Sequence, residues 1–390
     1  MPEYAGTVAQ WLFEPAKRNA LMDIFLNRDY TQYDQIKGGT HKPDNWPLAE
    51  DFRLYVKKDV APLIWTEAVG VVQPVTATVV DPYAEGWRDV AAVQVIGSGV
   101  GAGQGQFQSP QGVAVGADGS IYVADSMNHR IQKFDKDGQF AASFGGTTDG
   151  NLPGQFKEPW AVAVAPDQSI YVADTWNHRV QHLDPDGAAI KTWGAEGNTN
   201  GQAEGNEGVF FGPRGIATGQ DGRVFVADTG NKRIQIFDDA GTFVSQFGGS
   251  GLQPGQLDEP VGIATDAQGN IVVADTWNGR VQLFNPQGQP LNNWEIDGWL
   301  DKDKVGKPYL AVDGKSRVYV ADQVGRRILV FNESGKYLGG FGQYGNDTNG
   351  FGLPSGIAVD KEGYVYVVDT VFGRVLKYPP FEPAAVKEVP

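Results

Sequence analysis

Residues 110–134, PQGVAVGADGSIYVADSMNHRIQKF, contain the unit that decides the fold. An apolar five-residue stretch ending in aspartate returns six times, with 47 to 54 residues between successive aspartates. These aspartates are Asp125, Asp174, Asp228, Asp275, Asp322 and Asp369. An arginine follows each of them by five positions: Arg130, Arg179, Arg233, Arg280, Arg327 and Arg374. Self-similarity at a regular period of this length is typical of repeat architectures such as propellers.

Each repeat predicts four short strands separated by turns. The first follows a proline, the second ends in the aspartate, the third follows the arginine, and the fourth is aromatic and often ends in glycine. A period near 47 residues fits four strands of about five or six residues with their turns. One alanine recurs in every first strand: Ala114, Ala163, Ala217, Ala264, Ala311 and Ala358. Small residues suit the crowded strands nearest a propeller axis, so we expect an all-β, six-bladed β-propeller.

The end of the last repeat indicates how the ring closes. Pro379 and Pro380 stop strand pairing after RVLKY, so the sixth repeat lacks a fourth strand. Residues 89–98, DVAAVQVIGS, stand where a fourth strand stands elsewhere, and we expect them to complete the last blade. Closure removes the exposed edges of an open sheet. We therefore divide the chain into an N-terminal α/β extension packing on the propeller (1–88), a propeller closed by strand 89–98 (89–380) and a C-terminal tail (381–390).

These motifs resemble the NHL repeat, whose pattern is close to P-x-G-I-A-V-D followed by N-I-Y-V-A-D-T-x-N-x-R-I-Q-x-F-D. Repeats one to four fit best, with Asn128, Asn177, Asn231 and Asn278 at the third position after the aspartate. Gly325 and Phe372 replace this asparagine in repeats five and six, which puts those two turns in doubt. The resemblance implies a recognition platform in most members. A minority are lyases or hydrolases, and one animal branch binds RNA.

Composition narrows the function classes. The formal net charge is −15 and there are no cysteines, which argues against a nucleic-acid-binding surface and excludes disulfides and thiolate metal sites. No signal peptide or long apolar span is visible, so we expect no direct membrane insertion of this chain. The stretch NWPLAEDFRLYVKKDVAPLIW, residues 45–65, is weakly similar to soluble regions of bacterial membrane glycosyltransferases that carry NHL repeats. That similarity implies an extracytoplasmic chain, periplasmic or at the cell surface.

The repeated polar residues are interpreted as scaffold. A catalytic site is normally single, whereas the aspartate and arginine pair recurs with the fold, so we expect it to organise each turn. His129 and His178 lie at equivalent positions of adjacent repeats, over about 10 Å from the axis, and are too far apart to share one zinc ion. The sequence therefore predicts no metal site, no cofactor and no catalytic residues.

The candidate site is a ring of dissimilar residues at the mouth of the central channel. The residue after each first-strand proline reads Gln111, Trp160, Arg214, Val261, Tyr309 and Ser355. The residue two positions after each aspartate reads Met127, Trp176, Gly230, Trp277, Val324 and Val371. Packing explains why a repeat position keeps one residue type in all six repeats, but it does not explain why the residue types in these two rings differ. From these rings we therefore predict ligand-binding roles for Gln111, Trp160, Arg214, Tyr309, Ser355, Trp176 and Trp277. Tryptophan and arginine are also enriched at binding hot spots. Trp176 and Trp277 have an equally good second interpretation, which is that they cover the seams between blades.

The leading functional hypothesis is non-enzymatic recognition of a protein, peptide or glycan by this face. The first alternative is a metal-dependent lyase or lactonase-type enzyme, and the second is an accessory domain of a membrane glycosyltransferase. We expect no nucleic-acid partner, and the sequence indicates nothing about oligomeric state.

Overall fold

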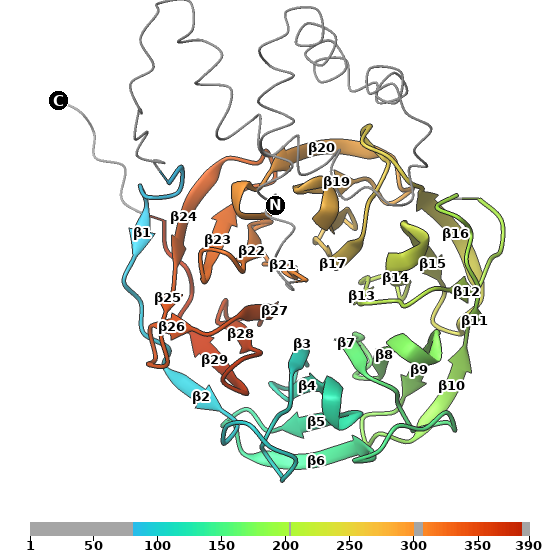
Figure 1. The fold of residues 1–390 in the computed structure, drawn as a ribbon, viewed down its shortest axis with the longest axis horizontal. Helices are drawn as coiled ribbons and strands as arrows, with labels where there is room; N and C mark the ends of the chain where they lie inside the picture. Colours follow the sequence, from blue (N-terminus) through green and yellow to red (C-terminus); the bar gives the residue numbers. More distant parts are fainter. Residues whose placement is uncertain (1–80, 203, 300–306, 384–390) are drawn as a thin grey trace, which may run out of the picture. The chain divides into compact units, whose positions relative to one another are not determined.

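The computed structural model describes residues 81–202, 204–299 and 307–383. These residues form strands joined by turns, and the strands radiate from a common centre as six blades (Figure 1). The predicted six-bladed β-propeller is thereby confirmed. Residues 1–80 and 384–390 lie outside the described residues, and with them lie nearly all of the predicted N-terminal extension and most of the predicted tail. None of the helices in the described ranges is both long and apolar enough to cross a membrane.

Each blade is built on antiparallel strands that follow one another in the chain from the axis outward, and blades 5 and 6 each gain an outer strand from the segment before blade 1. Blade 1 contains β3 (Pro110–Val115), β4 (Ile121–Asp125), β5 (Arg130–Phe134) and β6 (Phe140–Gly145). Blade 2 contains β7 (Pro159–Val164), β8 (Ile170–Asp174), β9 (Arg179–Leu183) and β10 (Ala189–Trp193). Blade 3 contains β13 (Gly215–Thr218), β14 (Val224–Asp228), β15 (Arg233–Phe237) and β16 (Phe243–Gly248).

The remaining blades follow the same order. Blade 4 contains β17 (Pro260–Thr265), β18 (Ile271–Asp275), β19 (Arg280–Phe284) and β20 (Pro290–Glu295). Blade 5 contains β21 (Leu310–Val312), β22 (Val318–Asp322), β23 (Arg327–Phe331) and β24 (Tyr337–Phe341), and blade 6 contains β27 (Pro354–Val359), β28 (Val365–Asp369) and β29 (Arg374–Tyr378). The two-stranded ribbons β11 (Ala195–Glu196) with β12 (Val209–Phe210) and β25 (Gln343–Tyr344) with β26 (Gly350–Phe351) lie in connections between blades.

The segment that precedes blade 1 supplies two outer strands. β2 (Gln94–Ile96) pairs antiparallel with β29, with Gln94 opposite Lys377 and Ile96 opposite Val375. Blade 6 thus obtains its fourth strand from within residues 89–98. β1 (Trp87–Arg88) runs parallel to β24 and makes a fifth strand on blade 5, beside which it is drawn in Figure 1.

The innermost strands approach so closely that glycine is required between them. A Cβ on Gly112 would lie 2.6 Å from the carbonyl oxygen of Trp160 in the next blade, and one on Gly262 would lie 2.7 Å from the backbone nitrogen of Leu310. Neither clash can relax, because both partners are backbone atoms. The glycine of the P-x-G motif is therefore a consequence of ring packing.

The recurring polar residues hold the loops of each blade, as the sequence predicts. Asp125 accepts hydrogen bonds from Arg130 Nε at 2.7 Å and from Asn128 Nδ2 at 2.8 Å, while the Arg130 guanidinium donates to the Gly103 and Gln106 carbonyls. A short 3₁₀ turn follows the aspartate in blades 1 to 4: Ser126–Asn128, Thr175–Asn177, Thr229–Asn231 and Thr276–Asn278. Blades 5 and 6, which lack the asparagine, have plain turns there. The asparagine therefore selects the turn while the aspartate–arginine pair holds the blade.

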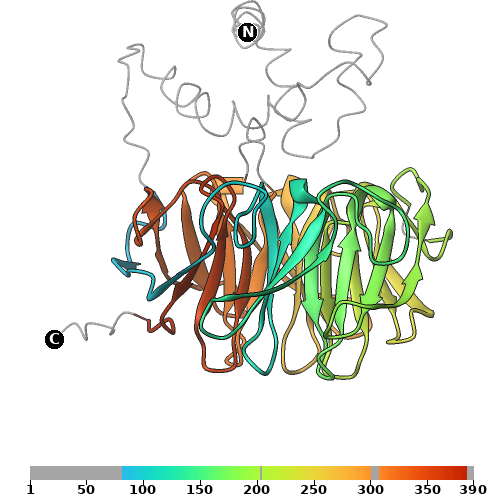
Figure 2. The same cartoon turned by 90° about the horizontal axis from the view of Figure 1, so that it is seen from below.

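The strand order divides the loops between two faces of the disc (Figure 2). The four strands of a blade alternate in direction, so the fourth strand ends at the face where the first begins. The connections from blade to blade therefore lie on this face, and so do the loops between second and third strands. We call this the channel-mouth face. Loops between first and second strands, and between third and fourth strands, form the opposite face.

Candidate functional site

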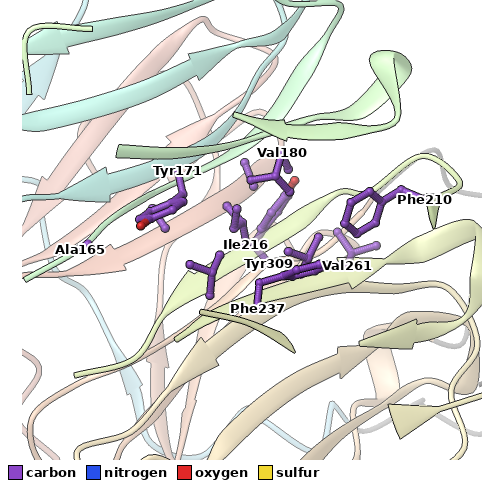
Figure 3. Close-up of a cluster of buried hydrophobic side chains, with 13 residues drawn as sticks. Ala165, Tyr171, Val180, Phe210, Ile216, Phe237, Val261 and Tyr309 are labelled. Carbon is purple, nitrogen blue, oxygen red and sulfur yellow. The ribbon is translucent and has the colours of Figure 1, made fainter. Parts of the chain in front are cut away.

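A tyrosine closes the centre of the channel-mouth face. Tyr309, at the start of blade 5, reaches across the axis so that its hydroxyl lies 2.8 Å from the Arg214 carbonyl oxygen and 3.1 Å from that of Trp160. Only 6% of the residue is exposed, and burial raises the pKa of its hydroxyl, which keeps the proton it donates to these carbonyls. Tyr309 and Val261 belong to a hydrophobic cluster whose other members come mainly from blades 2 and 3 (Figure 3).

This arrangement corrects the expected ring of open side chains. Tyr309, Val261 and Ser355 are buried. The Ser355 hydroxyl bonds to the Gln111 carbonyl oxygen at 3.1 Å and to the Thr370 hydroxyl at 2.8 Å, so it joins blade 6 to blade 1. Tyr309 and Ser355 therefore brace the ring, because the channel is narrow enough for side chains to meet their neighbours. The side chains of Gln111, Trp160 and Arg214 remain partly exposed.

Arg214 is the centre of the exposed part of the ring. Its guanidinium carbon lies 4.7 Å from the centroid of the Trp160 ring and 5.9 Å from that of Trp176, both in blade 2. Cation–π attraction of this kind gains strength as the groups are desolvated, and 15% of the Arg214 side chain is exposed. The structure thus brings together three residues that the sequence assigned to the site.

Two charged residues extend this cluster to blades 4 and 5. Glu259 lies 3.6 Å from Arg214 Nη1 and also pairs with the Lys307 ammonium group, which is 5.1 Å from the centroid of the Trp277 ring. Both Glu259 and Glu158, which accepts a 3.0 Å hydrogen bond from Trp176 Nε1, have φ of 47°. That left-handed conformation is uncommon for a glutamate. We refer to Trp160, Trp176, Arg214, Glu259, Trp277 and Lys307 together as the aromatic–ionic cluster.

Two polar atoms of this cluster are enclosed without a hydrogen-bond partner among the described residues. They are Arg214 Nε and the indole nitrogen Nε1 of Trp160. Both are donors, so an incoming acceptor oxygen is the group that would satisfy them. Buried donors are nearly always paired in native proteins, which makes this pair informative.

Five apolar side chains of the same face are exposed, and two of them, Trp176 and Trp277, belong to the cluster. Their exposed fractions are 45% for Met127, 38% for Trp176, 37% for Phe211, 41% for Trp277 and 51% for Val371. Four of them are residues two positions after the repeated aspartates. The fifth, Phe211, occupies the space over Gly230, where a Cβ would collide with its ring. Phe211 therefore replaces the side chain that blade 3 lacks. We call these five residues the apolar belt.

The two loop histidines have structural partners. His129 Nδ1 accepts a 3.1 Å hydrogen bond from the Glu158 backbone nitrogen, and His178 Nδ1 accepts one of the same length from Gly212. Each bond ties a blade to the connection that follows it. The described part of the chain contains no group of three or more histidine, cysteine, aspartate or glutamate side chains placed to hold a metal ion.

Sequence reasoning did not identify Phe211, Glu259 or Lys307. One signal for Phe211 was available, since the only glycine in the second ring, Gly230, coincides with the only repeat that carries Phe-Phe before its first-strand proline. Glu259 and Lys307 also had a signal, since both stand directly before a first-strand proline, at the position that Glu158 holds in the second repeat. Their meeting depends on how the blades turn around the axis.

Comparison with known proteins identifies the repeats. The NHL repeat model matches residues 107–134, 156–183, 210–237 and 257–284, and a model described as a 6-bladed beta-propeller matches residues 301–382. The chain is 28% identical over 148 residues to Protein brain tumor of Drosophila melanogaster, which covers 38% of this chain and 13% of that protein. It is 60% identical over 40 residues to B-box type zinc finger protein ncl-1 of Caenorhabditis elegans, covering 10% of this chain and 5% of that one. The chain thus spans only a small part of these relatives.

Two solved structures of low identity are similar to this chain. A gluconolactonase from Xanthomonas campestris has 15% identity and a TM-score of 0.51, covering 74% of this chain and 91% of that one. Virginiamycin B lyase from Staphylococcus aureus has 13% identity and a TM-score of 0.49, covering 70% and 95%. Similarity at this level concerns architecture alone. With four matched repeats and six blades, the chain is a six-bladed β-propeller that contains NHL repeats.

Proposed function

We propose that this propeller is a recognition module whose channel-mouth face binds a segment of another protein or a peptide. The observation that carries the proposal is the meeting of the apolar belt with the aromatic–ionic cluster on one face. Apolar side chains exposed together and rimmed by polar groups are typical of interaction surfaces.

The residue types favour a peptide-like ligand. Tryptophan and arginine dominate binding hot spots, and here Arg214 is held between Trp160 and Trp176 before any ligand arrives. Preorganisation of this kind lowers the entropy lost on binding. A peptide carbonyl oxygen suits Arg214 Nε and Trp160 Nε1, the two buried donors without a partner among the described residues, while aliphatic or aromatic side chains suit the exposed tryptophans.

The charges favour a ligand that is close to neutral where it meets the cluster. Arg214 and Lys307 are positive and Glu259 is negative. Glu158, which bonds to Trp176 beside the cluster, is also negative, so the four formal charges cancel. Glu259 already lies beside both cations. A strongly charged ligand would have to displace one of these ion pairs, whereas a peptide backbone would not.

We also propose, with less support, that the protein is extracytoplasmic and that it is associated with a membrane glycosyltransferase. Both proposals rest on the similarity of residues 45–65, which lie outside the described residues. An enzymatic role has weaker support, since the lactonase and lyase structures share the architecture at 15% identity or less.

The proposal is tested by selecting peptides from a random display library on the purified full chain and measuring their affinity by calorimetry. Trp160→Ala and Trp176→Ala should each weaken binding by about 2 kcal/mol, the loss expected of a hot-spot residue. Trp176 is partly exposed, so its truncation should leave the melting temperature nearly unchanged.

Leu291→Ala is the matched control for truncating an apolar side chain. Leu291 is 56% exposed and lies on the outer strand β20, away from the channel-mouth face. Its truncation should leave peptide affinity intact. The proposal fails if selected peptides lose affinity equally in all three variants. It also fails if a glycan array yields ligands that depend on Trp176 while the peptide library yields none.

A further inference from the structure

A cavity of about 330 Å³ lies at the seam between blades 5 and 6, at the edge of the disc. One wall comes from the segment that precedes blade 1, through Arg88 and Val90, and another from the outer strand of blade 5, through Phe341. The last wall is Tyr378 with residues 379–383. Arg317 anchors this final segment, because its Nη1 donates a 2.6 Å hydrogen bond to the Phe381 carbonyl oxygen. The cavity is thus built by residues from both ends of the propeller.

Two polar atoms, one on each of two residues that line this cavity, are buried without a hydrogen-bond partner among the described residues. They are Arg88 Nε and the Tyr378 hydroxyl. Tyr378 is 1% exposed, and burial raises the pKa of its hydroxyl, which therefore keeps its proton. An unpaired buried hydroxyl costs about 1–3 kcal/mol. An acceptor oxygen bound in the cavity would give both groups a partner.

The other walls are apolar and rigid. Phe341 and Phe381 are buried, and the rings of Phe341 and Tyr378 lie 4.7 Å apart. Pro379 and Pro380 complete the apolar lining. Glu382 also lines the cavity, but its side chain is exposed, so we place it at the rim. The volume is at the lower end of the range for small-molecule sites.

From these features we propose that the cavity binds a carboxylate group attached to a compact apolar body, with Arg88 and Tyr378 as its donors and the aromatic and proline side chains around the body. A carboxylate carries one negative charge and two acceptor oxygens, which matches one guanidinium and one phenol. A phosphate would carry more charge than a single arginine can balance. A free acid and the C-terminal residue of a peptide share this chemistry. This site is separate from the channel-mouth face and does not depend on the function proposed for it.

The test is a ligand-observed NMR titration of the full chain with 3-phenylpropionate. Saturable binding with a Kd of about a millimolar or lower is expected for so small a ligand. Its neutral counterpart, 3-phenylpropionamide, should bind about tenfold more weakly or worse, because it lacks the charge that strengthens the hydrogen bond to arginine. A short peptide ending in phenylalanine, with a free or an amidated C-terminus, forms the second arm. Tight binding of the free-acid peptide would identify a chain terminus as the source.

Two variants and two controls connect binding to the cavity. Arg88→Gln should weaken 3-phenylpropionate binding about tenfold or more, and Tyr378→Phe about threefold to tenfold. Tyr378→Phe should not lower the melting temperature of the free protein, because its hydroxyl has no partner to lose. Arg326 and Tyr344 do not line the cavity. The control variants Arg326→Gln and Tyr344→Phe should therefore bind 3-phenylpropionate like the parent chain.

Three results would overturn the proposal. The first is no saturable binding of either the acid or the free-acid peptide, which would leave water as the occupant. The second is equal binding of acid and amide. The third is undiminished binding in both Arg88→Gln and Tyr378→Phe.

Discussion

Truncating Ile96 to alanine should loosen the closure of the propeller. Ile96 is the only fully buried side chain of β2, with 0% exposed, and it packs in a cluster with Phe107, Val113 and Val375. Removing a fully buried isoleucine side chain down to alanine costs about 2–5 kcal/mol, part of it from the cavity left behind. The strand is only three residues long, so this loss falls on the short pairing that completes blade 6.

Val95→Ala is the control, because its side chain projects from the opposite side of the same strand and is 45% exposed. It should cost about 0.5 kcal/mol or less. Hydrogen exchange followed by mass spectrometry measures the effect where it occurs. In Ile96→Ala, the amides of β29 that pair with β2 should exchange faster, while those of β15 in blade 3 should be unchanged. An opened β29 would also present a free sheet edge, so aggregation should increase on warming.

The reasoning would be refuted if Ile96→Ala and Val95→Ala accelerated exchange in β29 equally, or if neither did. Uniform acceleration across all six blades would also contradict it, because it would mean that the ring opens only when the whole domain unfolds.

Three further predictions concern stability. Tyr309→Phe should lower the free energy of unfolding by about 1–3 kcal/mol, since two buried carbonyl oxygens lose their donor; urea denaturation measures this. Arg233→Met should cost about 3–5 kcal/mol by leaving the buried carboxylate of Asp228 unpaired, and thermal unfolding detects it. Hydrogen bonding to Arg327 lowers the pKa of Asp81, so Asp81 stabilises the fold above its unfolded pKa of about 4. This stabilisation is lost as pH falls through the folded pKa, and Asp81→Asn should flatten that part of the curve of melting temperature against pH.

Each of these has a matched control. Tyr344→Phe should be neutral, because that side chain is 73% exposed. Arg326→Met removes an arginine that neighbours Tyr344 and has no carboxylate partner among the described ion pairs, so it should cost far less than Arg233→Met. Asp89 lies in the same segment before blade 1 as Asp81 and has no arginine partner among the described residues. The curve of melting temperature against pH for Asp89→Asn should therefore match that of the parent chain. Equal effects in variant and control would contradict the corresponding prediction.

The sequence by itself determined the architecture. Every repeat carries the same apolar strand, aspartate and arginine, and these act through contacts within one blade and its own loop. Local patterns of this kind can be read without knowing the rest of the molecule. The plain turns at Gly325 and Phe372 also follow from one missing asparagine, because Asn128 and its equivalents bond within the same turn.

Tertiary structure alone decided which side chains remain available to a ligand. Tyr309 was expected at an open rim, but it crosses the axis and is buried by blades 2 and 3. Its exposure depends on the radius of the channel and on residues about a hundred positions away. Phe211 covers Gly230, and Glu259 contacts both Arg214 and Lys307. These contacts also join residues that are distant in the sequence and that only the packing of the ring brings together. The cavity between Arg88 and Tyr378 exists only because closure of the ring brings residues nearly three hundred positions apart to one seam. A repeat pattern specifies each blade, whereas contacts across the axis and at the closing seam arise from the packing of all six.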